Sequence, residues 1–117
     1  MAYVDGFVLA VPRDRIEDYR ALAATAAAVW KEHGALAVVE CVGDDVPVGE
    51  LTSFPRAVQL AEGEVVVFSW IVHPSRAERD RINAAVMADE RISRDFAALP
   101  FDAKRMIYGG FDVLLEV

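Results

Sequence analysis

The stretch Glu64-Val-Val-Val-Phe-Ser-Trp-Ile-Val72 decides the fold, because it is the most apolar run in the chain. Branched and aromatic side chains dominate it, which predicts a strand at the centre of a sheet. A strand with one face in water would alternate apolar and polar residues, and this stretch does not alternate. We therefore expect both faces of the strand to be covered and Phe68 to be almost fully buried.

Three more strands are predicted on either side of this central one. Residues 3–11 and 35–43 are rich in β-forming side chains, and residues 104–116 form the last such stretch, with two glycines in the middle. Residues 44–63 show no clear period, and a connection near twenty residues is long enough in a compact domain to suggest a function. Its second half, from residue 56 to residue 61, fits either a strand or a single helical turn.

Two helices are predicted between the strands. Apolar residues recur at helical spacing over residues 14–33, with Asp14 as an expected side-chain cap and Gly34 where a helix typically ends. Ser75 begins a second capping pattern, which predicts a helix from there to about residue 89. Residues 93–99 favour one more short turn.

The resulting order, β-α-β-β-α-β, predicts a ferredoxin-like α+β sandwich that forms a single domain over residues 1–117. Right-handed crossovers place both helices on one face of the sheet, with the first and third strands in its centre. The other face would expose a large apolar patch in a monomer, and such patches usually mark an interface. We therefore expect a homodimer in which a second copy packs sheet against sheet.

Composition excludes several classes of function. Twelve Lys and Arg residues stand against nineteen Asp and Glu residues, and a net charge of -7 argues against binding to nucleic acid. One cysteine rules out an internal disulfide, and no apolar window of about 20 residues predicts a membrane span. The start of the chain lacks the pattern of a signal peptide, so we expect a cytoplasmic protein.

No cofactor or metal is predicted. The sequence holds no phosphate-binding loop, no dinucleotide fingerprint, no zinc-ligand set and no haem motif. His33 and His73 are not spaced as metal ligands on one helix, so we expect no metal site.

Four segments are specific enough to indicate a family. In chain order they are Tyr3-Val-Asp-Gly-Phe-Val8, Val39-Glu-Cys-Val42, Phe68-Ser-Trp70 and Lys104-Arg-Met-Ile-Tyr-Gly-Gly-Phe111. Together they resemble the bacterial domain-of-unknown-function 1428 family, also called YbaA-like. The resemblance implies a dimeric α+β barrel, in which two ferredoxin-like sheets close into one barrel. The family has no established activity, and the barrel superfamily includes cofactor-free enzymes, so the resemblance permits an enzyme without naming a reaction.

The candidate catalytic residues are Asp5, Glu40, Arg105 and Tyr108. Asp5 lies in an apolar strand, where a carboxylate needs a partner or a raised pKa. It is either a general acid or base, or one half of a structural ion pair with Arg105. Because the first and last strands are neighbours in a ferredoxin-like sheet, we expect Asp5 and Arg105 to lie within salt-bridge distance, directly or through one intervening group.

The candidate ligand-binding residues are Trp70, Lys104, Arg105 and Tyr108. The two cations stand side by side before the last strand, where they either bind an anionic group or form a solvated strand entrance. The two aromatic side chains either line a cavity or fill the core.

Three functions stay open at this point. The first is a small-molecule pocket between sheet and helices with an enzyme-like site. The second is a binding module for a small anionic or aromatic metabolite, and the third is a homodimer that acts through protein partners. An enclosed pocket with a perturbed carboxylate would favour the first.

Overall fold

A computed structural model of the chain describes residues 2–117. Its four strands form one antiparallel sheet in the order β2-β3-β1-β4, and their bounds are β1 Tyr3–Pro12, β2 Ala37–Val42, β3 Glu64–His73 and β4 Ile107–Asp112. The apolar stretch that decides the fold is therefore β3, and it lies beside β1 in the centre, as predicted. Each of these two strands is paired on both sides.

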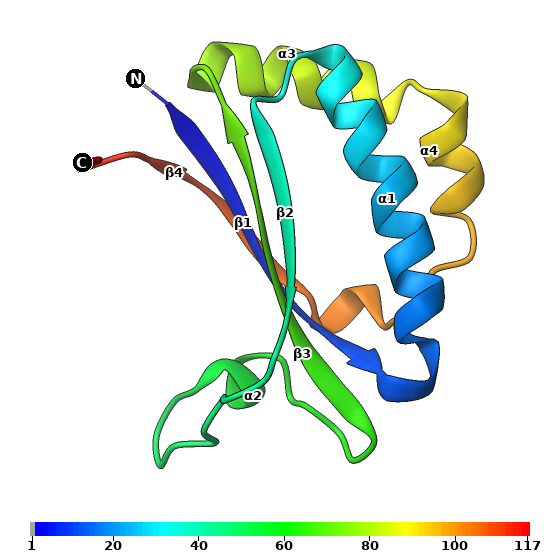
Figure 1. The fold of residues 1–117 in the computed structure, drawn as a ribbon, viewed down its shortest axis with the longest axis vertical. Helices are drawn as coiled ribbons and strands as arrows, with labels where there is room; N and C mark the ends of the chain where they lie inside the picture. The colour runs from blue at the N-terminus through cyan, green and yellow to red at the C-terminus, as the bar shows by residue number, and fades with distance from the viewer. Residues whose placement is uncertain (1) are drawn as a thin grey trace.

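Three helices cover one face of this sheet, as Figure 1 shows. They are α1 (Ile16–His33), α3 (Arg76–Met87) and the short α4 (Glu90–Asp95). The single turn α2 (Phe54–Ala57) lies on the opposite side, at the far end of the sheet (Figure 1). The ferredoxin-like α+β order predicted from the sequence is confirmed, and the uncertain segment near residue 56 is a helical turn. None of the described helices is both long and apolar enough to cross a membrane.

The helix ends were predicted with mixed success. The Ser75 hydroxyl caps α3 by accepting a hydrogen bond from the Glu78 backbone N–H at 3.1 Å, and Gly34 ends α1 with a φ of 121°. The predicted Asp14 cap is wrong, because a 3-10 turn, η1 (Arg13–Arg15), precedes α1 and no side chain caps it. The last strand is shorter than predicted, because a second 3-10 turn, η2 (Ala103–Arg105), occupies its expected start.

The main core lies between the sheet and the helices. Strand register and alternation turn Asp5, Phe7 and Leu9 of β1 toward the helices, together with Ser69 and Ile71 of β3. Leu9 and Ile71 are buried there. The helix residues buried in the same layer are Val29, Trp30, Ile82 and Val86. A cavity lies within this layer, between the sheet and the helices.

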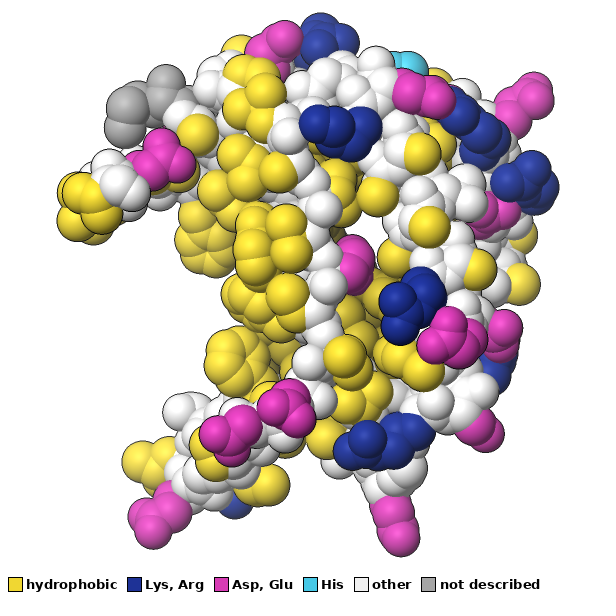
Figure 2. All heavy atoms as spheres, in the orientation of Figure 1, with side chains coloured by type: hydrophobic (Ala, Val, Ile, Leu, Met, Phe, Trp, Pro, Cys, Tyr) yellow, Lys and Arg dark blue, Asp and Glu magenta, His cyan; other side chains and the backbone are white. Residues whose placement is uncertain are grey.

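The opposite face of the sheet, which we call the outer face, is apolar and partly uncovered. Its exposed part includes Phe68 and Trp70 of β3 and Ile107 and Phe111 of β4. Hydrophobic side chains line a hollow between the C-terminal segment and the α2 end in Figure 2. The prediction that Phe68 is almost fully buried is wrong for the single chain: Phe68 is 40% exposed, although the Phe54 ring of α2 packs edge-on against it with centroids 5.8 Å apart.

Residues 44–63 close one end of the outer face. Val58 and Leu60 pack there against Val8 and Val66 of the central strands. The Arg56 guanidinium keeps the segment compact, because it donates hydrogen bonds to the carbonyl groups of residues 48 and 49. The long connection is thus an ordered cover for part of the sheet.

Candidate functional site

A pocket of about 440 Å³ lies between the helix-facing side of the sheet and the helices. Its wall is mainly apolar, and the side chains that shape it come from every layer: Phe7, Leu22, Ala26, Ile71, Met87 and Phe101. Alanines at positions 23, 26 and 27 of α1 face the sheet here, and their small side chains leave the space that larger residues would fill. A cavity of this size and character is typical of small-molecule sites.

Glu40 and Tyr19 form the main polar feature of this apolar wall. The Tyr19 hydroxyl of α1 donates a hydrogen bond of 2.5 Å to the Glu40 carboxylate of β2. Burial raises the pKa of the Glu40 carboxyl above its ordinary value, and hydrogen bonds from Tyr19 and Ser69 offset part of that rise. Burial, with the nearby Glu40 charge, raises the pKa of Tyr19 well above its ordinary value, so Tyr19 stays protonated and keeps donating.

A second opening reaches the same two residues from the edge of the sheet. This cavity of about 370 Å³ lies between α1 and β2, and Tyr19 and Glu40 line both cavities. β2 is an edge strand, and Glu40 as a whole residue is exposed. The Glu40 carboxylate is therefore accessible from the inner pocket and from solvent.

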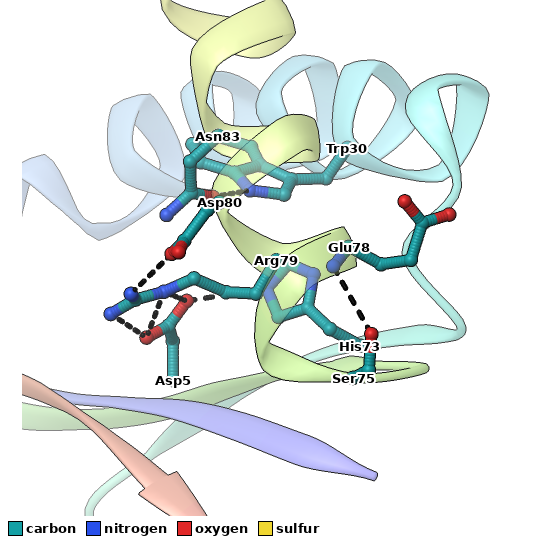
Figure 3. Close-up of polar contacts among 8 residues, drawn as sticks. All are labelled: Asp5, Trp30, His73, Ser75, Glu78, Arg79, Asp80 and Asn83. Carbon is teal, nitrogen blue, oxygen red and sulfur yellow. Dashed lines mark hydrogen bonds and ion pairs between the residues drawn. The ribbon is translucent and has the colours of Figure 1, made fainter. Parts of the chain in front are cut away.

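Asp5 lines the pocket but is held in a buried ion pair. Its carboxylate accepts hydrogen bonds from the Arg79 guanidinium of α3 at 2.9–3.1 Å, and His73 Nε2 lies 3.2 Å away (Figure 3). Arg79 also donates to Asp80 at 2.9 Å. The prediction that Asp5 pairs with Arg105 is wrong, because α3 crosses the sheet above Asp5 and supplies the nearer cation. These contacts favour the second alternative drawn from the sequence, in which Asp5 is one half of a structural ion pair.

Arg105 and Lys104 do not belong to the pocket. Arg105 pairs with Glu64 at 2.7 Å and with Asp102 at 3.1 Å, and these contacts hold η2 against the start of β3. The Arg105 guanidinium also lowers the pKa of Glu64 below its ordinary value, mainly by hydrogen bonding. Lys104 is exposed, and neither cation lines either cavity. The structure therefore gives no support to Arg105 as an anion anchor.

The two predicted aromatic residues lie on opposite faces of the sheet. Tyr108 lines the rim of the pocket, where its ring stacks beside Phe7 with centroids 6.4 Å apart. Trp70 lies on the outer face and packs against Phe68. Trp70 thus contributes no wall to the pocket.

Three residues of the site were missed from the sequence: Tyr19, Arg79 and Asn83. The Trp30 indole N–H donates a hydrogen bond of 3.0 Å to Asn83 Oδ1, and Figure 3 shows this pair above the Asp5–Arg79 contact. Arg79, Asn83 and Met87 are four residues apart and line the pocket with one face of α3. That spacing could have identified them from the sequence, because an Asn and an Arg on one face of a half-buried helix need hydrogen-bond partners.

The arrangement is suited to proton transfer on a mainly apolar molecule. It offers a carboxylate with a raised pKa, a fixed hydroxyl donor and a free path to water. Within residues 2–117 no three His, Cys, Asp or Glu side chains gather closely enough to hold a metal ion.

Comparison with known sequences gives a consistent assignment over the whole chain. A family model described as "Protein of unknown function (DUF1428)" matches residues 2–103. The chain is 52% identical over 116 residues to the uncharacterized protein YbaA of Escherichia coli K12, with 99% of each chain covered. YbaA of Shigella flexneri matches with the same identity and coverage.

Comparison with solved structures confirms the fold class. Rv0793 from Mycobacterium tuberculosis matches with a TM-score of 0.62 at 14% identity, and the match covers 99% of this chain and 98% of that one. A mutant of SnoaB, a cofactor-independent oxygenase from Streptomyces nogalater, matches with a TM-score of 0.64 at 13% identity, covering 99% and 96%. At such identities the likeness shows the shared fold, a ferredoxin-like α+β sandwich, and nothing about activity.

Proposed function

Since the chain belongs to the DUF1428 family of proteins of unknown function, its role has to be inferred from its site, and we propose that it is a cofactor-free enzyme that moves a proton on a small, mainly apolar molecule. The molecule binds in the pocket between sheet and helices. Glu40 is the general base, and Tyr19 holds its carboxylate in place. The cytoplasm, where small metabolites are made and consumed, is the proposed location.

One observation carries this proposal: the Glu40 carboxylate, with a raised pKa, lies against the Tyr19 hydroxyl on the wall of an apolar cavity. A carboxylate in such surroundings is a stronger base than one in water, because burial disfavours its charge. In the proposed step, Glu40 takes a proton from a weakly acidic C–H bond and the electron pair stays on the molecule as an enolate. The carboxylic acid then exchanges its proton with water through the second opening and returns a solvent-derived proton to a carbon of the enolate, which restores the Glu40 carboxylate.

Deuterium exchange into 2-tetralone tests the proposal, since this neutral bicyclic ketone has weakly acidic protons at C1. We expect the protein in D₂O to accelerate loss of the C1 proton signal in NMR. Glu40→Gln should slow the protein-dependent exchange by about 10²–10⁴-fold, the usual contribution of a general base. Glu50→Gln, a change of the same chemistry in the exposed loop, should leave the rate unchanged.

A second variant gives a readout that a merely structural Glu40 would not. Tyr19→Phe removes a hydrogen bond that lowers the pKa of Glu40, so the pH midpoint of exchange should move upward. Exchange no faster than buffer, or equal in the wild type and Glu40→Gln, would overturn the proposed function.

We also propose that two copies of the chain associate through the outer face. The support is an exposed apolar surface that includes Phe68, Ile107 and Phe111. Among the described strand residues, alternation leaves Cys41 as the one ionisable side chain at the centre of this face, and Glu64 at its end is paired with Arg105, although the chain carries a net charge of -7. Such an uncharged surface lets two acidic molecules associate without bringing like charges together.

A further inference from the structure

The polar groups on the α3 side of the pocket define what kind of molecule fits there. Arg79 is the only cation on the pocket wall among residues 2–117, and its charge is already paired. Its Nε and Nη2 groups donate to Asp5, and its Nη1 group donates to Asp80. With Glu40 also on the wall, no free positive charge is available for a carboxylate or a phosphate.

Asn83 differs from Arg79, because half of its hydrogen-bonding capacity is unused. Its Oδ1 atom accepts from Trp30 Nε1 at 3.0 Å. An indole N–H can only donate, so this contact fixes which end of the amide faces Trp30. The amide nitrogen is left on the side away from the indole, as Figure 3 shows, and no atom of the described chain accepts a hydrogen bond from it.

We propose that Asn83 determines the specificity of the pocket: its free amide N–H group binds a neutral oxygen acceptor, such as a carbonyl, on an otherwise apolar ligand. This inference rests on the proposed function and narrows its substrate class. An anionic metabolite is disfavoured, because every charged group that could receive it is acidic or already paired. The positioning of Asn83 by Trp30 prepares the donor before the ligand arrives, which lowers the entropic cost of binding.

Three probes of one shape separate these chemistries: 2-acetylnaphthalene, 2-ethylnaphthalene and 2-naphthoate. They carry a carbonyl, a hydrocarbon group and an anion on the same ring system. We expect the wild type to bind 2-naphthoate most weakly. The key quantity is the affinity of the ketone relative to that of the hydrocarbon, measured by competition or by calorimetry.

Asn83→Asp keeps an oxygen that accepts from Trp30 but removes the amide donor. It should lower the ketone-to-hydrocarbon affinity ratio about fivefold to tenfold, as expected for one lost hydrogen bond. Asn83→Leu, with neither donor nor acceptor, should lower the ratio to a similar extent. Gln59→Glu makes the same amide-to-acid change at an exposed position and should leave the ratio unchanged. The carbonyl stretching band of the bound ketone should lie at lower frequency in the wild type than in Asn83→Asp.

The possible failures are distinct from one another. An unchanged ratio in both Asn83 variants, or 2-naphthoate as the tightest probe, would overturn the role of Asn83. The proposed proton transfer would survive that result if Glu40 still controlled deuterium exchange. Binding of none of the three probes would overturn the pocket as a ligand site and the inference with it.

Discussion

At the scale of single residues, His73 is a titratable group that lies fully buried beneath α3. It is 0% exposed, its Nε2 atom faces Asp5, and its Nδ1 atom has no hydrogen-bond partner in the part of the chain described. Burial lowers the pKa of His73 below its ordinary value of 6.5, although the Asp5 charge acts in the opposite direction. Arg79, on the other side of Asp5, lowers it further.

The lowered pKa of His73 predicts loss of stability on mild acidification. Above pH 6.5 His73 is neutral in both states, so its contribution to the free energy of unfolding is fully present. As the pH falls below 6.5, the unfolded chain binds a proton that the folded chain resists, and stability is lost. Urea unfolding at pH 7.5 and pH 5.5 should show this decrease, and His73→Gln should reduce it. An equal decrease in His73→Gln would show that other groups cause it.

Sequence reasoning found the Glu40 and Asp5 carboxylates because a charged residue within an apolar strand stands out. It paired Asp5 with the wrong cation. The predicted strand order identifies which strands are neighbours, but it does not predict that α3 places Arg79 over Asp5. Tyr19 lies at a regular apolar position of α1, and that spacing cannot tell a side chain that fills space from one that reaches Glu40. Partners across layers depend on helix placement, which local patterns do not contain.

At the scale of elements, Gly110 of β4 shows how closely the sheet and α3 approach one another. Gly110 lies opposite Asp5 on the helix-facing side of the sheet. A methyl group at this position would meet the Tyr3 hydroxyl and would lie 2.7 Å from Arg79 Nη2. The Arg79 guanidinium also stacks over the Tyr3 ring, 5.2 Å from its centroid. The absence of a side chain at Gly110 leaves room for both the Tyr3 ring and the Arg79 guanidinium beside Asp5.

Gly110→Ala should therefore destabilise the fold by about 1–3 kcal/mol, the usual cost of overpacking a tight contact. The neighbouring change, Gly109→Ala, provides the control, because its methyl group would meet only the Phe111 ring at 3.6 Å, an ordinary contact distance. Chemical denaturation of the two variants measures the difference. Equal stability of the two variants would mean that Tyr3 and Arg79 yield without cost.

Elements themselves were predictable where one period held for many residues. The helix over residues 14–33 and the strand over residues 64–72 were found at nearly their observed bounds. The last strand was overextended to residue 116, because apolar residues after Asp112 look the same in sequence whether or not they pair. Hydrogen bonding to β1 ends at Asp112, and only the register reveals that limit.

At the scale of the whole molecule, the outer face decides the state of assembly. In the proposed dimer Phe68 becomes buried by the second copy, which would restore the environment that its sequence suggested. We expect the wild type to scatter light as twice the mass of one chain at micromolar concentration. Phe68→Asp places a charge on the outer face and should shift the protein to monomers. Ala28→Asp adds the same charge on the exposed side of α1 and should leave the dimer intact. A monomeric wild type would contradict the proposal.

The pairing of β1 with β3 also governs how the chain reaches its native state. The pairs run from Pro12 with Glu64 at one end to Tyr3 with His73 at the other, so the two central strands are distant in the chain. β4 then pairs with β1 from still farther along the sequence. β2 and β3 follow one another in the chain and pair directly, but no hairpin between sequence neighbours can start the central pair. A longer loop must therefore close before β1 joins the sheet. Such distant contacts give a high contact order, and refolding in milliseconds to seconds, slower than that of a helical protein of this length, follows from the strand order alone.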